Sequence, residues 1–321
     1  MKKSKKLPLI FISILALIAI LVVGISFVEK SSNNVFDLIN EIHDIDTETT
    51  VLYNDFQDDF YKFSDFADSG HSSKDELNTI KTYSDNAIES SKKTKDEINL
   101  LIGKIETIKS KNLNDLERNY IEKLEQATRS YNDNIDASLK LIDSKTRITE
   151  YNIYSSMFSE NYNEIYNSIA KKLTVYESQG NWDALDKELI SLNLELDEAI
   201  QNINGLKDSL GLDSFKTYDQ WASSMKEFFA LVKPLYEKEK KGATLSQSEI
   251  NAITEAIVKT DVFKADSDGY IWGPNEKDEF EAYKRNNVYE YEDDVSESFN
   301  RAEAYYNDAV LNYEQLLKNQ K

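Results

Sequence analysis

Apolar side chains recur every three or four residues along most of the chain beyond residue 34, which is the spacing of an α-helix with one apolar face. The first such stretch runs from about Val35 to Ala67 and the second from about Lys74 to Ser110, with a polar turn at 68–73 between them. Only nine glycines and three prolines interrupt the 321 residues. Because these residues are the usual helix breakers, the pattern predicts long helices joined by short turns.

Small polar residues share the apolar face of the second stretch. They stand at three positions where the period calls for an apolar side chain: Ser84, Ser91 and Thr94. Small side chains let two helices approach closely, so this face predicts a close helix contact rather than a strong coiled coil.

Two apolar stripes follow one another between residues 113 and 178 with no glycine or proline between them. Asn112 is expected to cap the first. The phases of the stripes differ slightly near Thr146–Glu150, so this interval is either one very long helix that shifts register or two helices that meet at a tight turn. We prefer a turn or kink there, because a helix of more than about 60 residues is rare in globular proteins.

The second half of the chain has clearer boundaries. The run Gln-Gly-Asn at 179–181 is expected to end the preceding helix and to cap another that begins at Trp182. The run 210–214 is expected to end that helix. A further helix should start near Phe215, and Pro234 should kink or terminate it.

The Ser-x-x-Glu pattern of Ser246 and Glu249 predicts the capped start of a short helix. The last helix is expected from about Glu276 to Leu317, where apolar residues again recur at heptad-like spacing. Between these two helices, the stretch 261–275 breaks the helical pattern.

This irregular stretch contains the sharpest local motif. The order Asp-Ser-Asp-Gly at 266–269 matches the centre of a calcium-binding loop, but Lys264 and Asn275 stand where the end ligands belong. A weak calcium site would therefore combine Asp266 and Asp268 of the motif with Asp261 and Glu276 on either side. Calcium is the only cofactor that the sequence suggests. The preferred alternative is a small hairpin, in which segments 262–265 and 270–273 flank an Asp/Gly turn.

The N-terminal segment carries a different pattern. Residues 7–28 hold no charged side chain, and as a helix they would span about 33 Å, close to the thickness of a bilayer core. The lysine-rich tail 1–6 is expected to stay in the cytoplasm, which places 31–321 outside. A secretory signal cleaved near Ser26 would export the same residues, but the apolar run is longer than the usual core of such signals. We therefore prefer a single-pass signal anchor.

Charge and cysteine content narrow the range of partners. The net charge is −20, and five of the six charged residues in the first 30 are lysines, so the exported part is more acidic still. An acidic surface repels nucleic acid, which we exclude as a partner. No cysteine is present, so apolar packing rather than disulfides must stabilise the exported part. The excess of lysine over arginine, with frequent asparagine and isoleucine, is typical of an AT-rich prokaryotic genome.

The sequence contains no catalytic signature. Thiol catalysis is excluded, and His43 and His71 do not stand at metal-binding spacing. There is no glycine-rich phosphate loop and no nucleophile elbow. The acidic runs 58–59 and 290–294 are interpreted as solvated helix faces, and the tyrosines between 151 and 176 as a packing seam. An enzyme is therefore not expected.

Together these patterns predict an all-α protein. A single transmembrane helix (7–28) is followed by an elongated antiparallel bundle with two subdomains, 31–178 and 181–321, and one irregular loop or small hairpin near 261–275. Helices of about 35 residues would make the bundle about 50 Å long.

The expected function is that of a non-enzymatic interaction or spacer module at the cell surface, with a protein partner in the envelope. The alternative is an extracytoplasmic, sensor-like bundle that binds a ligand and works with a partner membrane protein. Segments 215–235 and 261–275 would line its pocket. The oligomeric state stays open.

Overall fold

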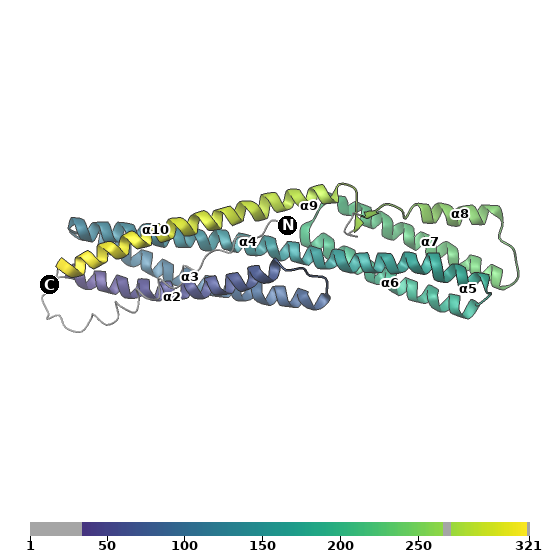
Figure 1. The fold of residues 1–321 in the computed structure, drawn as a ribbon, viewed down its shortest axis with the longest axis horizontal. Helices are drawn as coiled ribbons and strands as arrows, with labels where there is room; N and C mark the ends of the chain where they lie inside the picture. The colour runs from purple at the N-terminus through teal and green to yellow at the C-terminus, as the bar shows by residue number, and fades with distance from the viewer. Residues whose placement is uncertain (1–33, 266–270, 320–321) are drawn as a thin grey trace.

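A computed structural model describes residues 34–265 and 271–319 of the chain, and it is helical apart from one short pair of strands. The helices form an elongated antiparallel bundle, as predicted (Figure 1). The predicted membrane span, 7–28, lies outside the described residues. Within the described ranges, no helix combines the length and the apolar character needed to cross a bilayer. The helices are α2 (Asn34–Ala67), α3 (Lys74–Lys109), α4 (Asp115–Asn167), α5 (Thr174–Ser178), α6 (Trp182–Leu210), α7 (Lys216–Lys240), α8 (Gln247–Val258), α9 (Glu276–Lys284) and α10 (Glu290–Asn319).

One continuous helical run forms the axis of the molecule (Figure 1). Helix α4 passes into a π-helical segment, Ser168–Leu173, which passes directly into α5. At about 1.5 Å per residue, the run from Asp115 to Ser178 is about 95 Å long. The predicted turn or kink near Thr146–Glu150 is therefore wrong, and the expected length of about 50 Å is too short.

The change of phase near residue 148 has another cause. The partly buried Ile148 packs against two separate hydrophobic clusters, one toward each end of α4. Helix α4 therefore exchanges one set of neighbours for another at this point. Its apolar stripe shifts because the direction of the core changes, while the backbone stays helical.

The first bundle combines α2, α3 and the first half of α4 with α10, the last helix of the chain (Figure 1). Its core has two clusters that share these four helices. One lies near the start of α2 and contains Ile39, Ile105 and Tyr313. The other lies further along and contains Phe56, Ile98 and Ile142.

The second bundle packs α6, α7 and α8 around the second half of α4 (Figure 1). Its core is rich in aromatic rings, including Phe158, Tyr218 and Trp221. The predicted subdomains were 31–178 and 181–321. Helix α10 lies in the second of these ranges, but its side chains pack with α2, α3 and α4 of the first.

Several predicted helix boundaries are confirmed. Ser246 and Glu249 form a capping box at the start of α8. Gly180 and Gly211 adopt positive φ angles of 63° and 62° in the turns that precede and follow α6. Two details differ from the prediction. The N-cap of α4 is Asn114, whose side chain accepts from two backbone N–H groups. Of the two outcomes expected at Pro234, termination is wrong, because α7 continues past it to Lys240.

The small polar residues of α3 lie on its buried face, as predicted. The Thr94 hydroxyl donates to the Leu52 carbonyl oxygen of α2 at 3.0 Å. A hydroxyl reaches a neighbouring backbone only where two helices approach closely, so this bond marks the tight contact between α2 and α3.

Candidate functional site

The irregular stretch before α9 forms a small hairpin. Strand β1 (Lys264–Ala265) pairs antiparallel with β2 (Ile271–Trp272), and Lys264 lies opposite Trp272. This is the preferred hairpin alternative. The residues between the two strands, 266–270, are not among the described ones.

The predicted calcium ligands are placed only in part. Asp266 and Asp268 lie outside the described residues. Asp261 is exposed, whereas Glu276, the first residue of α9, is 0% exposed. Among the residues of 34–265 and 271–319, no three acidic or histidine side chains form a group suited to a metal ion. The calcium site stays a prediction.

Glu276 is the centre of a buried polar cluster. Its Oε1 accepts from the Tyr151 hydroxyl of α4 at 2.8 Å. The Tyr218 hydroxyl of α7 lies 3.0 Å from Oε1 and 2.9 Å from Oε2. The backbone N–H of Gly273, just after β2, donates to Oε2 at 2.7 Å. One carboxyl group therefore joins α4, α7, α9 and the hairpin.

Burial sets the ionisation of this cluster. Desolvation raises the pKa of Glu276, and the hydrogen bonds from Gly273, Tyr151 and Tyr218 oppose the rise by stabilising the carboxylate. Burial, together with the nearby Glu276 charge, raises the pKa of Tyr151 and of Tyr218 well above the usual tyrosine range. Both tyrosines therefore stay protonated and act as hydrogen-bond donors.

Local backbone geometry delivers Glu276 to this position. Asn275, which precedes the helix, adopts the left-handed conformation with φ of 66°, which reverses the chain between β2 and α9. Gly273 also fits the site closely, because a Cβ there would lie 3.2 Å from Glu276 Oε2. One helical turn further, Glu279 Oε2 accepts from the Ser214 N–H at 3.1 Å and so fastens α9 to the 3-10 turn that precedes α7.

The other end of the stretch is fastened in the same manner. The Tyr166 hydroxyl of α4 donates to the carbonyl oxygen of Thr260 at 2.9 Å. Phe263, just before β1, packs its ring 4.7 Å from Tyr218 and 5.4 Å from Phe158. Tyrosines of α4 thus hold both ends of the segment 261–275.

This arrangement is suited to holding elements together rather than to turning over a substrate. The Glu276 carboxyl is fully buried and its oxygens already accept from three groups of the protein. An acid or base in catalysis must reach the proton that it transfers. Trp221, from the segment 215–235 expected to line a ligand pocket, packs its ring 5.8 Å from that of Tyr162 of α4.

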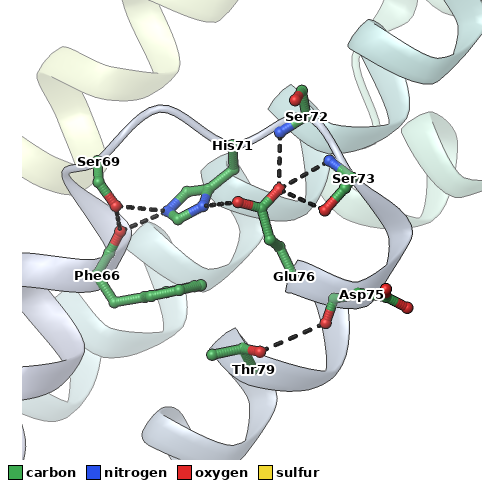
Figure 2. Close-up of polar contacts among 8 residues, drawn as sticks. All are labelled: Phe66, Ser69, His71, Ser72, Ser73, Asp75, Glu76 and Thr79. Carbon is green, nitrogen blue, oxygen red and sulfur yellow. Dashed lines mark hydrogen bonds and ion pairs between the residues drawn. The ribbon is translucent and has the colours of Figure 1, made fainter.

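A second polar cluster lies at the turn between α2 and α3 (Figure 2). The His71 ring stands between the Phe66 carbonyl oxygen, which its Nε2 contacts, and the Glu76 carboxylate, 3.2 Å from its Nδ1. Glu76 also accepts from the backbone N–H groups of Ser72 and Ser73 at 2.9 and 2.7 Å. These bonds lower the pKa of Glu76 to about 2. The His71 ring therefore links the end of α2 to the start of α3 across this turn.

Two buried side chains inside the first bundle carry no motif that sequence reasoning recognised. Asn134 of α4 accepts from the Tyr53 hydroxyl of α2 at 2.8 Å and donates to the Val295 carbonyl oxygen of α10 at 2.8 Å. Lys145 of α4 forms ion pairs with Asp68 at 2.9 Å and Glu292 at 3.0 Å.

These partners are far apart in sequence, which explains why they were missed. The Tyr151–Glu276 bond spans 125 residues and the Asn134–Val295 bond spans 161. The only local signal was a polar residue on an otherwise apolar helix face, which Asn134 and Lys145 both provide.

Comparison of the chain with protein-family models, curated proteins and solved structures finds no match.

Proposed function

We propose that the protein is a membrane-anchored, extracytoplasmic helical spacer that presents its second bundle to a protein partner in the cell envelope. The observation that supports this most is the uninterrupted run from Asp115 to Ser178, which joins the two bundles over about 95 Å. A helix of that length, packed along its whole course, holds its two ends at a fixed separation. A compact helical bundle would be stable without holding two ends so far apart.

The direction of the spacer follows from the order of elements. Helix α2 begins at Asn34, shortly after the predicted anchor 7–28, at the end of the molecule where α10 also ends (Figure 1). That end is therefore the membrane-proximal one in this proposal. The α5–α6 turn and the α7–α8 turn lie at the opposite end (Figure 1).

The polar clusters support a mechanical role. Each ties helices together through buried bonds, at Asn134 and Lys145 in the first bundle and at Glu276 in the second. Glu276 also fixes α9 to α4, next to the point where the two bundles meet. A rod that transmits position benefits from such cross-links, because they oppose sliding of one helix along another.

The topology can be tested in intact cells, because the chain has no native cysteine. Single cysteines are introduced at Ser4, in the predicted cytoplasmic tail, and at Asp213, whose side chain is 92% exposed. A membrane-impermeant maleimide should label Asp213→Cys in intact cells and Ser4→Cys only after permeabilisation. The reverse pattern, or labelling of both in intact cells, would overturn the proposed orientation.

The interaction is tested with a photo-crosslinking amino acid at two matched positions. Leu194 of α6, 63% exposed, lies in the second bundle, and Leu311 of α10, 57% exposed, lies near the opposite end. Leu194 should capture a defined envelope or membrane protein, and Leu311 should not. Capture of nothing, or only of a second copy, from Leu194 would contradict the spacer proposal.

A further inference from the structure

Three helices of the first bundle enclose a small cavity near the end at which α2 begins. Its walls include Asp46 of α2, Tyr120 of α4, and Ala309 and Tyr313 of α10, and its volume is about 20 Å³. A cavity needs about 10–15 Å³ of such space to hold one water molecule. The cavity is therefore large enough for one water molecule and too small for an organic ligand.

Asp46 supplies a hydrogen-bond acceptor to this cavity. The residue is 6% exposed and its side chain lines the cavity. No lysine or arginine lines the cavity, whose other titratable side chains are His43, Glu314 and the tyrosines. Burial raises the pKa of Asp46 to about 7 and lowers that of His43. A buried carboxyl is costly unless it accepts hydrogen bonds, so a donor within the cavity would stabilise it.

Tyr120 supplies an unsatisfied hydroxyl to the same space. The residue is 1% exposed, and its hydroxyl has no hydrogen-bond partner among the described residues. Its neighbour Tyr313, whose ring lies 5.3 Å away, donates instead to Asn40 Oδ1 at 3.1 Å. The cavity is thus lined by one buried hydroxyl without a protein partner and by the Asp46 carboxyl of another helix.

We propose that this cavity is a binding site for a single water molecule, which accepts a hydrogen bond from Tyr120 and donates one to Asp46. Water suits the site because it offers donors and acceptors at once and needs only two to four polar partners. Calcium takes six to eight oxygen ligands and magnesium demands an octahedron, more than this wall provides. The bound water would tie α2 to α4 beneath α10, independently of any partner of the protein.

The direct test counts long-lived water molecules by oxygen-17 magnetic relaxation dispersion on the full chain in detergent micelles. Ala309→Val adds two methyl groups at the cavity wall and should remove one such water. Ala302→Val is the matched control, since Ala302 is also buried on α10 but does not line the cavity. An unchanged count in Ala309→Val, or an equal loss in both variants, would overturn the proposal.

A second measurement covers the case in which Ala309→Val does not fold. The unfolding midpoints of Asp46→Asn, Tyr120→Phe and the double variant are compared at pH 5, where the Asp46 carboxyl is neutral. A shared water predicts that the two effects are not additive, whereas additive shifts would contradict it. Replacing choline by sodium or potassium should leave the wild-type midpoint unchanged. A cation-dependent rise that Asp46→Asn abolishes would instead assign the site to a monovalent cation.

Discussion

Buried polar side chains decide which helix faces which. Asn134 reaches α2 and α10 at once, and Lys145 pairs with carboxylates from both sides of α4. Apolar faces alone tolerate several alignments of two helices, because one ridge packs nearly as well as the next. A buried hydrogen bond or ion pair is satisfied in one alignment only, so the wrong alignments carry an unpaired polar group.

Glu276 offers the clearest test at this scale. Glu276→Ala should lower the free energy of unfolding by about 3 kcal/mol, because it leaves the Tyr151 and Tyr218 hydroxyls and the Gly273 N–H without their acceptor. Glu276→Gln keeps one carbonyl acceptor and should cost less, about 1 kcal/mol. Urea unfolding followed by circular dichroism measures both. The exposed Glu290→Ala is the control, and equal losses at the two positions would refute the role of Glu276.

Asp46 predicts a pH dependence whose sign follows from its raised pKa. Its pKa is about 7 in the folded protein against a model-peptide value of 3.8, so between these pH values the folded state binds a proton that the unfolded state has released. The contribution of Asp46 to stability is therefore lost as the pH rises from about 4 to 7, by about 4 kcal/mol at 1.36 kcal/mol per pKa unit. The loss is complete above pH 7.

The measurement is the difference in unfolding free energy between Asp46→Asn and the wild type across this range. Asparagine does not ionise, so the variant should gain on the wild type steadily from pH 4 to 7 and hold the gain above that. A difference that stays flat with pH would show that Asp46 does not titrate in the way its burial implies.

At the scale of elements, helix ends could be predicted from local chemistry, and helix continuity could not. The capping box at Ser246 and the breaks at Gly180 and Gly211 each depend on a few adjacent residues. The absence of a break near residue 148 depends on which neighbours α4 meets on either side of Ile148. A shift in the apolar stripe has the same appearance in the sequence whether the backbone bends or the core changes direction.

The π-helical segment 168–173 gives a test of this view. Its wider turn accommodates one additional residue in the continuous run of α4 and α5. Deletion of the exposed Ala170 should convert it to α-helix and cost at most about 1 kcal/mol. Deletion of the exposed Asp143, within α4, rotates everything after it by about 100° and should cost more than about 4 kcal/mol. Thermal melts compare the two, and equal losses would contradict this account of the segment.

At the scale of the whole molecule, length is the property that sets this fold apart from a compact bundle. The axis from Asp115 to Ser178 contributes side chains to the cores of both bundles. Lys145 of this axis pairs with Glu292 of α10, and Tyr151 of the axis donates to Glu276 of α9, so both bonds hold the last two helices against it.

Small-angle X-ray scattering of residues 31–321 measures this length. The maximum dimension should reach about 95 Å or more, since the continuous run alone has that extent. A protein folded back at 146–150 would give a value nearer the 50 Å expected for helices of 35 residues. The shorter value would disprove the continuous axis.

The sequence by itself determined the all-helical class, most helix ends and the small hairpin, because each depends on spacing or capping among residues close together in the chain. It did not reveal the polar clusters around Asn134 and Glu276, each of which includes a partner more than 120 residues away. Nor did it place α10 beside α4 or decide that α4 is unbroken. Those features arise when distant faces meet, and only the tertiary structure brings them together.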